Sequence, residues 1–229
     1  MRKSLFLFLP IILLSSCTGT DEKINQGELS YEISYPYLDL GPLMSAMLPD
    51  EMTITFKDKQ MLTTLQKGKM FTSTVLTNEE TETVRMTLSL FGSEHYYCEL
   101  TPEEVNQLVE SQPLYEVKST TTKDSVGGCW SQEYKVSSNN DTMPPFNAWF
   151  TEDLSIEHGA WFSAYTVAKG MPIIYDVERY GMMMHSECIN FKDKEVDDKV
   201  FELEEGFDKI NFKTYEKKVQ ELFDALLYE

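Results

Sequence analysis

Three stretches of this 229-residue chain alternate between apolar and polar side chains, at residues 29–37, 52–57 and 84–90. In the first stretch, for example, Leu29, Tyr31 and Ile33 are separated by Ser30 and Glu32. Successive side chains of a β-strand point to opposite faces of the sheet, so a period of two predicts strands with one buried and one solvated face.

Weaker strand patterns occupy much of the remaining chain, and turn residues such as Gly68, Gly92 and Gly181 separate several of them. The weaker candidates are residues 60–65, 70–77, 94–100, 114–120, 130–136, 146–151, 171–179 and 182–191. About ten strands at this spacing predict a mainly β (α+β) fold, in which a curved antiparallel sheet forms a half-barrel.

Three helices are expected to cover this sheet. Residues 42–48 are apolar and lie between Gly41 and Pro49. Residues 101–109 begin with Thr-Pro-Glu-Glu, which is the pattern of a capping box with proline at the first helical position. Residues 214–228 carry an apolar stripe and predict a C-terminal amphipathic helix. No linker-like composition divides residues 27–229, so we expect one β-rich domain there.

The N-terminus has the pattern of a bacterial lipoprotein signal. A basic start and an apolar run precede Leu14-Ser15-Ser16-Cys17, which resembles a lipobox. The resemblance implies a signal peptide at residues 1–16, lipid attachment at Cys17 and a polar tether over residues 17–26. Thr18 follows the cysteine in place of the aspartate that retains some lipoproteins in the inner membrane. We therefore expect an outer-membrane-anchored protein of the cell envelope, whether periplasmic or surface-exposed.

The charge balance excludes some partners. The formal net charge is −18, and nucleic-acid binding needs an electropositive face that this sequence does not provide. Four acidic pairs are expected to lie on the solvated surface. They are Glu79-Glu80, Glu103-Glu104, Asp197-Asp198 and Glu204-Glu205.

Two His-x-x-Cys pairs, at residues 95–98 and 185–188, raise the question of a metal site. In a strand, however, positions i and i+3 face opposite sides, so we expect neither a metal nor another cofactor. No nucleophile motif surrounds any cysteine, and no enzyme activity is predicted. Cys98, Cys129 and Cys188 are an odd number of thiols in an oxidising compartment, and their disulfide state stays open.

The chain resembles uncharacterised Gram-negative envelope lipoproteins of the GLPGLI type over roughly residues 27–212. The matching segments are TTTK at 120–123, DSVGGCW at 124–130, WFTE at 149–152, KGMPI at 169–173, VFEL at 200–203 and GF at 206–207. Glu204 stands where those families have proline. The resemblance implies an architecture like the lipoprotein-carrier (Lol) fold, a curved sheet with its concave face covered by helices. It carries over no catalytic residue.

Two functions fit these expectations. In the first, the concave face holds a lipid or another apolar ligand, with residues 42–48 as a lid. The expected ligand-binding residues are Tyr31, Ile33, Met44, Met47, Met52, Ile54, Phe56, Met86, Leu88 and Met184. In the second, the protein is a structural or interaction lipoprotein with a filled core and no small-molecule ligand. The sequence identifies no protein partner and no oligomeric state.

Overall fold

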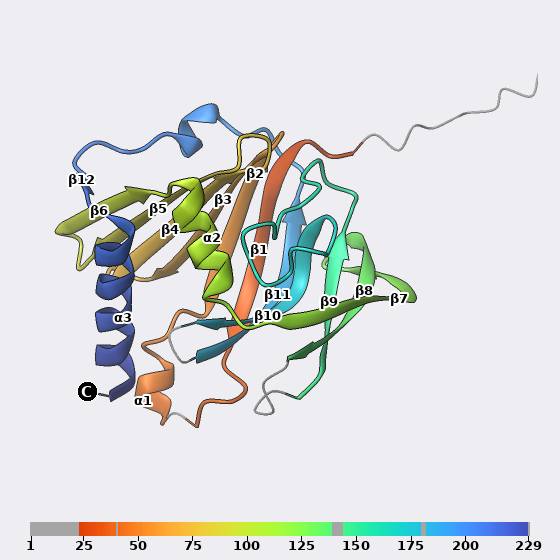
Figure 1. Ribbon diagram of the computed structural model, residues 1–229, viewed down its shortest axis with the longest axis horizontal. Coiled ribbons are helices and arrows are strands. Elements are labelled where there is room, and N and C mark those ends of the chain that lie inside the picture. The colour runs from red at the N-terminus through yellow and green to blue at the C-terminus, as the bar shows by residue number, and fades with distance from the viewer. Residues whose placement is uncertain (1–22, 40, 139–143, 180–181, 229) are drawn as a thin grey trace, which may run out of the picture.

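Twelve strands pair in one open, curved sheet (Figure 1). The computed structural model describes residues 23–39, 41–138, 144–179 and 182–228, so residues 1–16 and Cys17 lie outside the described residues. Across the sheet the order is β12-β6-β5-β4-β3-β2-β1-β11-β10-β9-β8-β7. All the pairings are antiparallel except the short β12–β6 pairing. The predicted mainly β class, with a curved antiparallel sheet, is confirmed.

The sequence order of the elements is simple. The strands are β1 (Gln26–Ser34), β2 (Glu51–Lys57), β3 (Gln60–Lys67), β4 (Phe71–Asn78), β5 (Thr83–Leu90), β6 (Glu94–Glu99), β7 (Tyr115–Val126), β8 (Cys129–Ser138), β9 (Phe146–Thr151), β10 (Met171–Arg179), β11 (Met182–Lys192) and β12 (Asp208–Lys209). The helices are α1 (Pro42–Ser45), α2 (Pro102–Glu110) and α3 (Phe212–Tyr228), with a 3-10 turn at Asp198–Phe201.

Strand β1 lies at the centre of the sheet, between β2 and β11. Its buried residues alternate as the sequence predicts, and β2 and β5 show the same pattern. The strand ends at Ser34, although the alternation continues to Tyr37, because Pro36 lacks the N–H that a ladder requires. At the other end, Ile24 already bridges to Leu154, so the fold begins within the expected tether.

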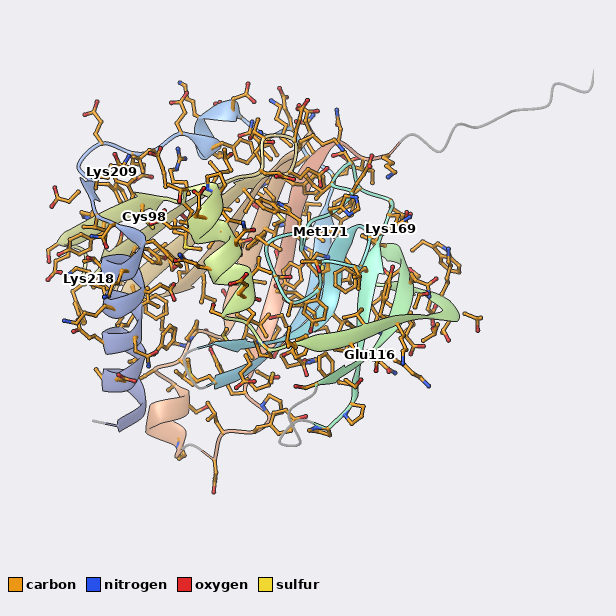
Figure 2. All side chains as sticks on the ribbon, viewed as in Figure 1. Cys98, Glu116, Lys169, Met171, Lys209 and Lys218 are labelled. Carbon is orange, nitrogen blue, oxygen red and sulfur yellow. The ribbon has the colours of Figure 1, made fainter. Side chains whose placement is uncertain are left out.

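The helices cover the half of the sheet that contains β3 to β6. The predicted capping box of α2 is confirmed, since Thr101 and Glu104 exchange hydrogen bonds between side chain and backbone. Helix α1 has four residues, fewer than the seven expected for that segment. Figure 2 shows side chains between the sheet and α3 and labels Lys218 on that helix. The ammonium group of Lys218 lies 4.1 Å from the centre of the Tyr96 ring.

Three apolar clusters hold these layers together. The first joins α2 and α3 to β4, β5 and β6, and it includes Phe71, whose ring meets that of Phe223. The second lies on β1, β2 and β11, and the third on β8 and β9. Residues 152–170, here called the strap, contribute Leu154 to the second cluster and Tyr165 to the third. The strap contains no helix or paired strand and crosses in front of β1, β10 and β11 (Figure 1).

Candidate ligand pocket beneath the strap

An apolar pocket of about 170 Å³ lies between the sheet and the strap. The sheet lines it with Ile33, Met52, Ile54, Met61, Thr63, Leu65, Val75, Pro172, Tyr175, Asp176, Val177, Glu178, Met184 and Ser186. The strap, the connection from α2 to β7 and the first residue of β7 add Gly159, Ala160, Phe162, Ser163, Ala164, Tyr165, Gln112, Pro113 and Tyr115. The pocket is thus formed by strands far apart in sequence and roofed by one irregular segment.

Four of the ten residues expected to bind a ligand line this pocket. Ile33, Met52 and Ile54 come from neighbouring strands β1 and β2, and Met184 comes from β11. They share a face because β1 pairs with both β2 and β11. The alternating pattern therefore brings these four side chains together, as expected.

The other six expected residues lie elsewhere. Tyr31 is fully buried beside the pocket, where its hydroxyl donates to the carbonyl of Pro172 at 2.6 Å. Phe56 stacks on Phe191. Met86 and Leu88 are buried in the cluster beneath the helices, and Met47 packs against that same cluster. The side chain of Met44 lies outside the described residues.

Residues 42–48 do not roof the pocket, because none of its described lining residues comes from that segment. The roof is the strap, which was not expected to contribute to a site. Its sequence has no regular apolar period that would have marked it. Small residues in the strap, notably Gly159, Ala160 and Ala164, let its backbone pass close to the sheet.

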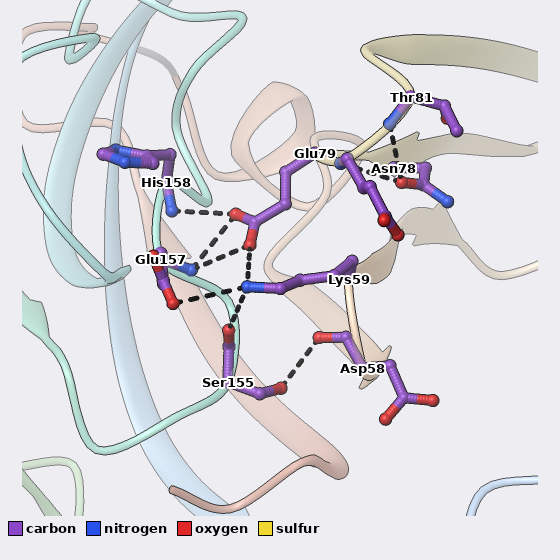
Figure 3. Close-up of polar contacts among 9 residues, drawn as sticks. Asp58, Lys59, Asn78, Glu79, Thr81, Ser155, Glu157 and His158 are labelled. Carbon is purple, nitrogen blue, oxygen red and sulfur yellow. Dashed lines mark hydrogen bonds and ion pairs between the residues drawn. The ribbon is translucent and has the colours of Figure 1, made fainter.

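Glu79 fixes one end of the strap (Figure 3). Its carboxylate accepts the backbone N–H groups of Glu157, at 3.1 Å, and of His158, at 2.8 Å. Lys59 pairs with the same carboxylate at 2.8 Å and also donates to the carbonyl of Ser155. The side chain of Glu79 is 10% exposed, so the expectation that it is solvated is wrong: the strap covers it.

Electrostatics at Glu79 favour the ionised form. Burial alone would raise the pKa of its carboxyl group. The hydrogen bond from Lys59 and the two backbone N–H donors outweigh that effect, and the pKa is lowered below its ordinary value of 4.5. The same contact raises the pKa of Lys59. Glu79 therefore remains charged at neutral pH and holds the strap through charge-assisted hydrogen bonds.

Gln112 fixes the strap at a second place. Its amide nitrogen donates to the carbonyl of Phe162 at 3.1 Å, and its amide oxygen accepts the N–H of Ala164 at 3.0 Å. Further along the strap, the hydroxyl of Tyr165 donates a hydrogen bond to the backbone carbonyl of Asp176. These contacts hold the pocket's roof on both β10 and the connection before β7.

The histidines have separate side-chain partners, and two of the three thiols, Cys129 and Cys188, belong to the same apolar cluster. His185 Nδ1 is 2.6 Å from a carboxylate oxygen of Asp176, and His95 Nδ1 is 2.9 Å from the Ser89 hydroxyl. Cys98, Cys129 and Cys188 are buried free thiols. Burial raises the pKa of each of them, that of Cys98 and Cys129 to about 12. Among the described residues, no group of three or more His, Cys, Asp or Glu side chains could hold a metal ion.

Comparison with known proteins identifies a fold and no family. No family model and no curated protein matches the chain. Two structures of a protein named PNGF-II, solved in space groups C2 and P21, are similar to it with TM-scores of 0.54 and 0.53. Their sequence identities are 15% and 13%, and each match covers 86% of this chain. The chain spans about a third of their length, at 33% and 34%. At this identity the likeness concerns the fold alone.

Proposed function

We propose that this protein is an outer-membrane-anchored lipoprotein of the cell envelope that binds a lipid or another apolar ligand in the pocket beneath the strap. The observation that carries the proposal is the pocket itself, which exposes Ile33, Met52 and Met184 within a half-barrel. An apolar cavity of about 150 Å³ can hold benzene or xenon. The volume here therefore suits one ring or a short alkyl segment, with any longer chain leaving through the pocket mouth.

Adjacent threonines on β3 provide a matched test of binding. Thr63 lines the pocket and pairs across the sheet with Ile54 and Val75, whereas Thr64 belongs to the opposite face. A Thr63→Phe substitution is expected to fill the pocket and remove ligand that co-purifies with the protein. The control Thr64→Phe should retain it. Native mass spectrometry after mild purification measures the difference, and an unliganded wild-type mass would contradict the proposal.

Membrane anchoring is a separate part of the proposal and rests on the lipobox residues alone. Three acyl chains on Cys17 would anchor the protein stably, since each buried methylene contributes about 0.8 kcal/mol. No helix among the described residues is long and apolar enough to cross a bilayer. The substitution Cys17→Ser is expected to move the protein from the membrane fraction to the soluble fraction. An unchanged distribution would contradict lipid attachment.

A structural or interaction lipoprotein is the second candidate. Much of the concave face is filled rather than hollow: Met86 and Leu88, for example, pack beneath α2 and α3. The pocket is also smaller than the roughly 300–1,000 Å³ of typical small-molecule sites. The Thr63→Phe experiment separates the candidates, because an interaction protein would show no ligand in either the wild type or the variant.

A further inference from the structure

Trp130 is exposed at the end of the sheet where the chain enters the fold. It is the second residue of β8, and it is 56% exposed. Its backbone N–H donates to the carboxylate of Asp153 at 2.7 Å. The backbone carbonyl of the same Asp153 accepts the N–H of Ile24 at 3.0 Å. One residue of the strap therefore holds Trp130 beside Ile24, which lies two residues before β1.

The chain is fixed at Ile24, a short distance in sequence after the expected lipid attachment site. Ile24 bridges to Leu154, and its carbonyl accepts the N–H of Ser155 at 2.8 Å. Six residues, 18–23, separate Ile24 from Cys17. An extended chain covers at most about 3.6 Å per residue, so this connection reaches no further than about 25 Å. A lipid on Cys17 would thus keep the Ile24 end of the sheet close to the bilayer surface.

Tryptophan suits the boundary between the head groups and the acyl chains of a bilayer, since the indole has an apolar body and one N–H donor. A single indole binds a bilayer weakly. A short tether, however, raises the effective concentration of the binding surface to about the millimolar range, so a weak contact is sufficient to hold one orientation. The net charge of −18 provides no attraction to anionic lipid, so the contact is expected with zwitterionic lipid.

We propose that Trp130 docks the domain on the zwitterionic lipid surface to which Cys17 is anchored, and that it fixes the Ile24 end of the sheet against the membrane. This inference rests on the proposed function, because it requires the lipid on Cys17. It adds a second membrane contact, made by the folded domain itself, and a defined orientation. The opposite ends of the strands then point away from the bilayer.

Phe91 provides a reference for this orientation, because it is an exposed aromatic residue at the opposite end of the sheet. The strand register places Thr83, the first residue of β5, in the same row as Gln26 at the start of β1. Phe91 directly follows the last residue of β5, eight positions after Thr83, which corresponds to about 27 Å along the strand. It is 69% exposed. Phe91 and Trp130 are thus comparably exposed, and only Trp130 lies beside the tether.

Quenching of tryptophan emission by brominated lipid tests the contact. The lipidated full-length protein is reconstituted in phosphatidylcholine vesicles with brominated or ordinary acyl chains, and flotation first measures anchoring. Bromine is expected to remove about a third of the emission, since one of the three tryptophans contacts lipid. Floating protein with unquenched emission would overturn the docking and leave the anchor intact. Protein that does not float would overturn the anchor, and this inference with it.

A matched double variant tests the orientation. Trp130→Phe combined with Phe91→Trp keeps three tryptophans and moves the exposed one to the opposite end of the sheet, while the partly buried Trp149 and Trp161 stay unchanged. Quenching by brominated lipid is expected to fall at least about threefold below the wild type, because a docked domain keeps residue 91 away from the bilayer. Equal quenching of the two proteins would mean that the tethered domain tumbles freely, and it would overturn the proposal.

Discussion

The carboxylate of Glu79 accepts the backbone N–H of His158 at 2.8 Å, and so joins two residues 79 positions apart in the chain. Glu79 directly follows β4, whereas His158 belongs to the strap. Backbone N–H groups of an irregular segment have no ladder partner, so an external acceptor is needed where they are covered. The side chain of Glu79 provides it and thereby fixes the height of the pocket's roof above the sheet.

We predict that Glu79→Gln lowers the free energy of unfolding by about 1–3 kcal/mol, because the amide loses the Lys59 ion pair and presents a donor to backbone donors. The exposed neighbour Glu80 provides the control, and Glu80→Gln should have little effect. Urea unfolding measures both variants. Equal stability of the two would mean that the Glu79 contacts do not stabilise the fold.

The pH dependence of this contact has a definite sign. The pKa of Glu79 is lowered in the folded state, so its stabilising contribution is complete above the ordinary value of 4.5. That contribution is lost as the pH falls through the folded-state pKa. The difference in stability between the wild type and Glu79→Gln should therefore shrink below pH 4.5. A difference that stays constant across that range would contradict the assigned ionisation.

Gly170 ends the strap with a backbone that only glycine accommodates easily, at φ +86°. A Cβ there would collide with the carbonyl of Thr151. We predict that Gly170→Ala lowers stability by more than about 3 kcal/mol, since both strain and overlap contribute. Gly206 has φ +90° with open space around it, so Gly206→Ala should cost about 1 kcal/mol. Thermal unfolding compares the two, and similar losses would show that the Thr151 contact is easily relieved.

Gln112 makes two hydrogen bonds to the strap, and its removal should loosen the roof locally. We predict that Gln112→Ala increases hydrogen exchange at the Ala164 amide and costs about 1–2 kcal/mol of stability. The exposed Gln107 on α2 serves as control. Unchanged exchange at Ala164 in the Gln112 variant would indicate that other contacts suffice to hold this part of the strap.

The buried thiols should resist alkylation. With pKa values of about 12, Cys98 and Cys129 have almost no thiolate at pH 8, and Cys188 is shifted in the same direction. Iodoacetamide is therefore expected to leave all three unmodified in the native protein and to modify them in urea, as read by mass spectrometry. Rapid labelling of the native protein would contradict this burial. Labelling in urea that requires a reductant would reveal a disulfide, the question that sequence leaves open.

Much of the sheet was predictable because its pattern is local. Residues such as Leu29, Ile54 and Leu88 alternate with polar neighbours, and that alternation fixes which face is buried without reference to distant parts of the chain. The Thr101–Glu104 capping box is likewise contained within four residues. The confirmed helices and strands are mostly those whose signals lie within one short window.

The pocket was only partly predictable. Whether an apolar side chain on the buried face packs in the core or lines a cavity depends on contacts that are distant in sequence. Ile33 and Phe56 belong to the same apolar face by periodicity, yet the first lines the pocket and the second is packed against Phe191. A glutamate such as Glu79 is ordinarily expected on the solvated surface. Its role in holding the strap is visible only once the strap is placed over it. Alternation identifies a buried face and does not distinguish packed core from pocket wall.

The central position of β1 has a consequence for how the chain matures. Leu29 pairs with Phe191 and Ser34 with His185. Strand β1, the first in the chain, therefore cannot complete its pairing until β11 has been synthesised. A chain that emerges N-terminus first, from a ribosome or a translocation pore, cannot join its two halves until nearly 190 residues have appeared. Long-range closure of this kind is slow, so the chain is expected to stay unfolded for much of its synthesis.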